Sequence, residues 1–100
     1  MNLKTGKLIT VVAEAFVSDR IIREMLRLGA SGYSAMPVGG QGSRGIRASL
    51  GERKNVKIES VVNESVLDKI LHLLAEHYVP QYAVVVYVRD VEIVHGSEYV

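Results

Sequence analysis

The stretch Gly39-Gly40-Gln41-Gly42-Ser43-Arg44-Gly45-Ile46-Arg47 interrupts the apolar pattern near the middle of this 100-residue chain. Its four glycines allow successive backbone amides to converge on one point, because glycine reaches positive φ without steric cost. Ser43, Arg44 and Arg47 add hydroxyl and guanidinium donors for an anion. The pattern predicts a phosphate-binding loop, and a surface hairpin with solvated arginines is the alternative interpretation.

The same run contains a G-x-G-x-x-G spacing at Gly40, Gly42 and Gly45, but its context excludes a dinucleotide-binding fold. That fold needs a helix directly after the glycines, and residues 47–55 show no apolar 3.6-residue period. A P-loop is also excluded, because no Gly-Lys-Ser/Thr ends the run.

Apolar periodicity on both sides of the loop predicts six elements. In residues 8–13 and 82–88, apolar side chains occupy both the odd-numbered and the even-numbered positions, which is typical of strands covered on both faces. Helix starts are predicted at Ser18, as an N-cap, and at Ser65, which resembles a capping box with Asp68. The expected order is strand 8–13, helix 19–28, strand 32–38, strand 56–62, a helix from Ser65 that Pro80 ends, and strand 82–88.

This order predicts an α+β fold of the ferredoxin-like βαββαβ (split βαβ) type, with both helices on one side of a four-stranded sheet. The other sheet face would then be bare, although two strands are too apolar to meet water there. Self-association in a closed cyclic arrangement is the simplest solution. The long insertion at 39–55 exceeds what a hairpin needs, which indicates a binding loop.

Composition places limits on function. The formal net charge is +1 and cysteine is absent, so we expect no general attraction to nucleic acid and no thiolate or disulfide chemistry. No window holds the apolar run of a membrane helix and no signal peptide is evident, so we expect a cytoplasmic protein without membrane insertion.

Several short motifs together resemble a PII-like signalling protein of the carbon-regulatory branch, which accompanies bicarbonate transporters or carboxysomes. They are Gly32-Tyr33, the 39–47 run, Tyr82-Ala83, and Tyr87 followed by Val91-Glu92. The similarity covers nearly the whole chain, which would be a single domain over 1–100 with the phosphate loop and T-loop at 39–55.

The resemblance implies a homotrimer that binds adenine nucleotide in clefts between subunits and signals through a T-loop that changes order with the ligand. AMP or ADP is the expected effector, with ATP and cyclic AMP as further candidates and no catalysis expected. By resemblance, the phosphate contacts are Gly40, Gln41, Gly42, Ser43, Arg44 and Arg47, and the base and ribose contacts are Ser34, Met36, Tyr87 and Arg89.

Bicarbonate is a further implied ligand, for which Gln41 and Arg47 are the candidates, and a bicarbonate transporter or carboxysome component is the implied partner. The tyrosine-bearing T-loop and the Gly-Lys-rich B-loop of nitrogen-regulatory PII proteins are not found. We therefore expect neither 2-oxoglutarate sensing nor uridylylation.

The alternative function is an acylphosphatase-like phosphohydrolase, which shares the strand order and has a phosphate cradle with an arginine. Its cradle follows the first strand, whereas this loop follows the second. His72 and His77 lie five residues apart on a predicted helix and do not share one side, so we expect no metal site there and a solvated pair between His72 and Glu76.

Overall fold

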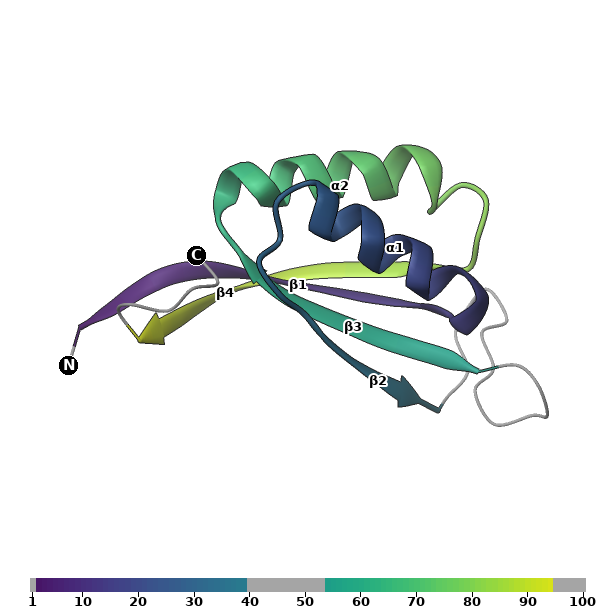
Figure 1. The fold of residues 1–100 in the computed structure, drawn as a ribbon, viewed down its shortest axis with the longest axis horizontal. Coiled ribbons are helices and arrows are strands. Elements are labelled where there is room, and N and C mark those ends of the chain that lie inside the picture. Colours follow the sequence, from purple (N-terminus) through teal and green to yellow (C-terminus); the bar gives the residue numbers. More distant parts are fainter. Residues whose placement is uncertain (1, 40–53, 95–100) are drawn as a thin grey trace.

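Six elements follow one another in the predicted order in the computed structural model, which describes residues 2–39 and 54–94. They are β1 (Leu3–Glu14), α1 (Ala15–Arg27), β2 (Ser34–Val38), β3 (Asn55–Val62), α2 (Glu64–His77) and β4 (Val85–Val94). The strands form one antiparallel sheet in the order β2-β3-β1-β4, and both helices cover the same side of it (Figure 1). The predicted ferredoxin-like α+β fold is therefore confirmed.

The core lies between the helices and alternate residues of the central strands. In β1 the side chains of Ile9, Val11 and Ala13 are fully buried, and the cross-strand partners Ile58 and Ser60 on β3 are buried too. The helices contribute one apolar stripe each, as a 3.6-residue period requires. The helical members of the core are Val17, Ile21, Met25, Leu67, Ile70, Leu74 and, just beyond α2, Tyr78.

The predicted start of the first helix is wrong by four residues. Ser18 lies inside α1, where it is buried and its hydroxyl donates to the Ala15 carbonyl at 2.9 Å. The helix begins at Ala15 because the chain turns directly from β1, and the Ala15 amide donates to the Lys54 carbonyl at 2.8 Å. A main-chain bond thus satisfies an amide at the start of α1, and the helix has no side-chain cap.

The second helix also begins earlier than predicted. Its N-cap is Asn63, whose side-chain oxygen accepts a hydrogen bond from the Val66 amide at 2.9 Å, so Ser65 and Asp68 lie inside the helix. The predicted C-terminal stop of α1 at Gly29 is confirmed by its φ of 121°. A Cβ at that position would lie 3.0 Å from Val66, so glycine also permits the close approach of the two helices.

Strand β1 extends past both predicted limits of 8–13, whereas β4 begins at Val85, later than the predicted start at Tyr82, and continues to Val94, beyond the predicted end at Val88. Their outer halves pair from Leu3 with Val94 to Lys7 with Asp90, and Lys7 Nζ lies 2.6 Å from Asp90 Oδ1. This two-stranded ribbon projects beyond the helices (Figure 1). Apolar alternation weakens in this ribbon, which explains why sequence periodicity did not predict it.

Pro37 lies within β2, at the edge of the sheet, and pairs with Val56 of β3. Proline has no amide hydrogen, so an edge strand is the place where a sheet tolerates it. The predicted strand 32–38 is confirmed in part, because β2 begins at Ser34.

Candidate functional site

Both helices lie on one side of the sheet, and no helix or strand of residues 2–39 and 54–94 covers the opposite side. Residues paired across an antiparallel sheet point to the same face, so the register identifies every side chain on this open face. The register gives one row across all four strands, Ser34–Glu59–Thr10–Tyr87. A second row is Met36–Lys57–Val12–Val85, and Arg89 and Leu8 begin the next one.

All four residues predicted to contact base and ribose lie on this open face. Ser34 and Met36 belong to β2, and Tyr87 and Arg89 belong to β4, which form the two opposite edges of the sheet. With strands spaced about 4.8 Å apart, three spacings separate these edges by about 14 Å. One chain therefore brings the residues to the same face, but it does not bring the two pairs together.

The open face is apolar for a surface exposed to water. Met36, Val85 and Tyr87 are 46%, 46% and 42% exposed on it. A contiguous surface of this kind is typical of an interface with another molecule.

A shallow hollow of about 220 Å³ adjoins Ser34, and two of its polar lining residues, Tyr33 and Glu59, were not among the predicted site residues. It is lined by Leu8, Tyr33, Ser34, Glu59, Ser60 and Val61. The Glu59 carboxylate lies 3.5 Å from the Thr10 hydroxyl and 3.7 Å from Lys57 Nζ, so it is held near the middle of its row. A carboxylate placed this way can accept hydrogen bonds from ligand hydroxyl or amino groups.

The strand alternation did place Glu59 on the polar side of β3, but a single charged residue on a strand is usually solvated. Only the cross-strand register shows that Glu59 stands directly beside Ser34. Tyr33 precedes β2 and is 46% exposed, so no periodic pattern selected it.

The six predicted phosphate contacts, from Gly40 to Arg47, lie outside the described residues, as does most of the predicted 39–55 loop. The structure does place the two ends of that segment. Val38 pairs with Asn55, and the Ala15 amide bonds to the Lys54 carbonyl, so both ends lie beside the start of α1 (Figure 1). The Asn55 side-chain oxygen is buried there without a hydrogen-bond partner in the described structure.

An aromatic cluster with one arginine occupies the same end of the molecule, on the helical side. Arg20 lies over the rings of Tyr78 and Tyr82, and the Tyr78 hydroxyl donates to Glu24 Oε2 at 2.6 Å. This hydrogen bond lowers the pKa of Glu24, and Arg27 adds to the effect. Burial raises the pKa of Tyr78, and the bond to Glu24 raises it further.

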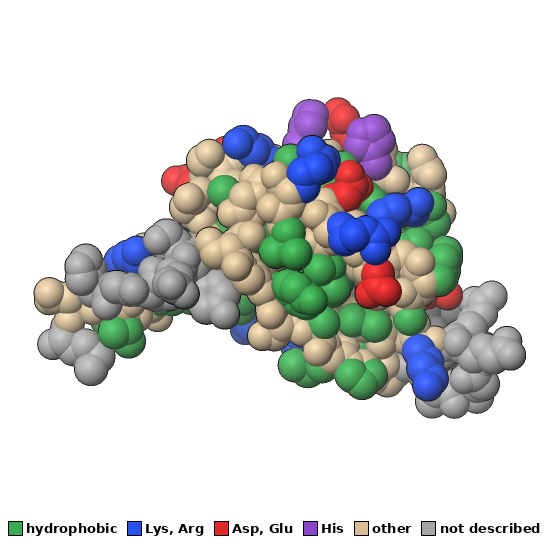
Figure 2. All heavy atoms as spheres, viewed as in Figure 1, with side chains coloured by type: hydrophobic (Ala, Val, Ile, Leu, Met, Phe, Trp, Pro, Cys, Tyr) green, Lys and Arg blue, Asp and Glu red, His purple; other side chains and the backbone are tan. Residues whose placement is uncertain are grey.

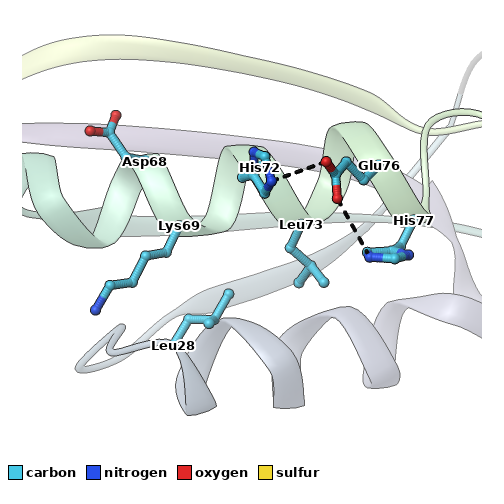
Figure 3. Close-up of a pocket in the computed structure, with 7 residues that line it drawn as sticks. All are labelled: Leu28, Asp68, Lys69, His72, Leu73, Glu76 and His77. Carbon is cyan, nitrogen blue, oxygen red and sulfur yellow. Dashed lines mark ion pairs between the residues drawn. The ribbon is translucent and has the colours of Figure 1, made fainter.

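A separate groove of about 490 Å³ lies between the last turn of α1 and the outer side of α2 (Figure 3). Leu28 and Leu73 point into it, and His72 and His77 both approach Glu76, at 3.0 and 3.8 Å. His72 and Glu76 are exposed, as the predicted solvated pair requires. Within residues 2–39 and 54–94, no cluster of three His, Cys, Asp or Glu side chains is arranged to hold a metal ion. None of the predicted site residues lines this groove.

In the described part of the chain, neither helix is long and apolar enough to span a membrane.

Comparison with known proteins identifies the family. The family model for nitrogen regulatory protein P-II matches residues 6–98. The chain belongs to the P-II family. The resemblance seen in the sequence is therefore confirmed.

Solved structures of this family have the same fold. A PII-like signaling protein from Thermus thermophilus is 46% identical over 100% of both chains, with a TM-score of 0.85. CPII from Thiomonas intermedia, bound to ADP, AMP and acetate, is 19% identical over 94% of this chain and 93% of its own, with a TM-score of 0.81. The same protein bound to ADP and bicarbonate is 21% identical over 92% of this chain and 91% of its own, with a TM-score of 0.82.

Proposed function

We propose that this P-II family protein binds adenine nucleotides, AMP or ADP first, in clefts between neighbouring copies of a cytoplasmic homotrimer. The bound nucleotide would then control a partner in inorganic-carbon uptake or fixation, such as a bicarbonate transporter or a carboxysome component, through the 39–55 loop. The proposal assigns the protein no reaction of its own.

One observation carries the proposal: the candidate base and ribose residues share one open face but occupy opposite edges of the sheet. Ser34 and Tyr87 stand at the two ends of a single cross-strand row, about 14 Å apart by strand spacing. An adenosine cannot contact both ends in one chain. A closed ring in which the β2 edge of one copy meets the β4 edge of the next would complete the site.

The chemistry of the two edges suits a nucleoside. Beside β2, Ser34 and Glu59 offer a hydroxyl and a carboxylate for ribose hydroxyls, and Met36 offers an apolar side chain for the base. On β4, Tyr87 supplies an aromatic face and Arg89 a cation. The phosphate would extend toward the end of the sheet where Val38 and Lys54 mark the ends of the glycine-arginine segment.

The comparisons support the choice of ligand. CPII from Thiomonas has been solved with ADP and AMP, and also with ADP and bicarbonate. By analogy, bicarbonate would bind near the nucleotide phosphates, where Gln41 and Arg47 are the candidate contacts.

Calorimetric titration tests the nucleotide part directly. AMP, ADP, ATP and cyclic AMP are each titrated into the protein, with and without bicarbonate, and we expect saturable binding of at least AMP or ADP. Arg23 is an exposed arginine on α1, away from the open face, so Arg23→Gln is the matched control for variants that remove a positive charge from the site. Absence of saturable binding by all four nucleotides contradicts the proposal.

A complementation experiment tests the location between copies. Glu59→Arg damages only the β2-edge half of a site, and Arg89→Glu damages only the β4-edge half. Each variant alone should bind no nucleotide, but refolding an equal mixture should restore about one quarter of the clefts, because these combine two intact edges. If the mixture stays inactive while it assembles normally, the site does not lie between copies.

A further inference from the structure

The helical side of the molecule carries an arginine that is held in place by aromatic rings instead of by a carboxylate. The Arg20 guanidinium lies 5.4 Å from the ring centre of Tyr78 and 5.5 Å from that of Tyr82. One of its nitrogens donates to the Tyr82 hydroxyl at 2.7 Å. Across residues 2–39 and 54–94, no Asp or Glu forms an ion pair with it.

This arrangement positions the guanidinium against two aromatic rings without pairing it with a carboxylate of the described residues. Arginine presents five N–H donors in a planar fork that matches a carboxylate. One of these donors bonds to the Tyr82 hydroxyl and Tyr78 also interacts with the guanidinium, but no carboxylate of residues 2–39 and 54–94 lies within ion-pair distance of it. A cation positioned in this way binds an anion with less loss of side-chain freedom than a mobile one.

The nearby carboxylate of Glu24 interacts with Arg20 electrostatically but forms no ion pair with it within 4 Å, and its oxygens are bound by other groups. Glu24 Oε2 accepts the Tyr78 hydroxyl at 2.6 Å, and Glu24 Oε1 lies 3.3 Å from Arg27. The pKa of Glu24 is lowered chiefly by the Tyr78 hydrogen bond, so Glu24 remains an ionised member of this network at neutral pH.

These residues line a groove of about 480 Å³ between α1, the end of α2 and the connection to β4. Its lining combines cations with aromatic and apolar surface: Arg20, Glu24, Arg27, Leu73, His77, Tyr78, Gln81 and Tyr82. Two arginines face one carboxylate there, so the groove is cationic even with His77 neutral. In Figure 2, Lys and Arg side chains and carboxylates gather over the helices, with the histidines of α2 above them.

Exposed aromatic surface continues the groove toward the end of the sheet. Phe16 is 72% exposed, and its ring packs edge-on against Tyr82 with the centroids 6.0 Å apart. Arginine and aromatic side chains are the residue types that dominate binding energy at protein interfaces. Sites for small molecules enclose their ligand, whereas this surface is broad and open to solvent.

We propose that this groove is a docking site for an acidic peptide segment of a partner protein. A carboxylate of the segment pairs with the guanidinium of Arg20, and an adjacent apolar or aromatic side chain packs against Phe16 and Tyr82. Charge complementarity selects this occupant. The neighbouring groove at Leu28 is lined by Asp68 and Glu76 as well as Lys69 and would not favour the same segment.

The docking site lies on the face opposite the nucleotide-binding face proposed above, and peptide binding to it does not require nucleotide. The proposal of peptide docking and the proposal of nucleotide binding can therefore be tested, and contradicted, independently. The test uses the full chain without nucleotide, labelled with ¹⁵N, and follows backbone amides and arginine side-chain resonances during peptide titration.

The probe is the blocked peptide Glu-Glu-Phe-Glu-Glu, and its matched control is Gln-Gln-Phe-Gln-Gln. We expect saturable shifts of Arg20, Gln81 and Tyr82 with the glutamate peptide and none with the glutamine peptide. Arg20→Gln should weaken binding about tenfold or more, because a charge-assisted pair is lost. Arg23→Gln removes the same charge from the same helix outside the groove and should change the affinity by less than about twofold.

Thermal unfolding establishes that each variant is folded. If Arg20→Gln is not, Arg20→Lys replaces it, because lysine retains the charge but not the planar fork and should still weaken binding several-fold. Equal binding of both peptides, equal losses in Arg20→Gln and Arg23→Gln, or no saturable shift at millimolar peptide each overturns the proposal.

Discussion

The two faces of the sheet differ in how far their apolar side chains are buried within one chain. On one face, two helices bury Ile9, Val11 and Ile58 within a single chain. On the other face, which mixes polar and apolar side chains, Met36, Val85 and Tyr87 are 42–46% exposed. One face of this sheet is therefore stabilised by the chain's own helices, whereas the other leaves apolar side chains exposed, which is typical of a surface that contacts another molecule.

The sharpest test of this difference uses adjacent residues of β1 that point to opposite faces. Ile9→Ala empties a fully buried position beneath the helices and should cost about 2–5 kcal/mol of unfolding free energy. Leu8→Ala, its neighbour on the open face, should cost clearly less when measured in a monomeric background. Denaturant unfolding of both variants gives the two values, and equal costs would contradict the distinction.

The second test concerns association through the open face. Val85→Glu places a charge where another copy should pack, and we expect it to reduce the mass from about three chains to one, because burying an unpaired carboxylate is unfavourable. Leu26→Glu is a matched control, since Leu26 is 41% exposed on α1 and Val85 is 46% exposed on β4. Light scattering after size exclusion measures both. If the wild-type protein is monomeric at micromolar concentration, the expected trimer is contradicted.

The third test addresses the predicted phosphate contacts. Arg47→Ala should weaken AMP or ADP binding ~10- to 100-fold, since a charge-assisted hydrogen bond contributes ~1.5–3 kcal/mol. Arg44→Lys should also weaken binding, because a point charge does not replace a planar fork. Calorimetry compares them with Arg23→Gln on the helical side. Unchanged affinity in Arg47→Ala and in Arg44→Ala would exclude the phosphate assignment.

The smallest expected effect lies in the helical network. Tyr78→Phe removes the strongest cause of the lowered Glu24 pKa and should cost about 1 kcal/mol of stability at neutral pH. A lowered folded pKa adds stability above the unfolded value of about 4.3, and this stability is lost as the pH falls through the folded pKa. The difference between wild type and variant should therefore be constant near neutrality and shrink in acid. Urea unfolding at a series of pH values measures it, and a difference that grows in acid would contradict this assignment.

Most of the fold was predictable because the apolar residues repeat with the periods that strands and helices impose. The helix starts were not predictable in the same way. Ser18 and Ser65 are good capping residues by type, but a main-chain bond to Lys54 starts α1 and Asn63 caps α2. The start of α1 depends on a distant segment, which a local pattern does not contain, whereas the start of α2 is set by a local residue, Asn63, that is as good an N-cap by type as Ser65.

The site was predictable in part for a related reason. The resemblance selected Ser34, Met36, Tyr87 and Arg89, and the register places all four on one face. Glu59 was missed because its importance comes from its position opposite Ser34, a relation between two strands. The arginine cluster was missed too, since Arg20 and Tyr82 meet across 62 residues of sequence.

Pro37 has a consequence for the solubility of the protein. Exposed edge strands invite other chains to add strands without limit, and this is a common route to aggregation. In β2 the edge pairs inward with β3 and carries a residue that has no N–H to offer an incoming strand. Pro37 therefore lowers the number of backbone donors that this edge can offer to another chain. Side chains then contribute more to a contact at this edge, which favours a partner of defined sequence over unlimited addition of strands.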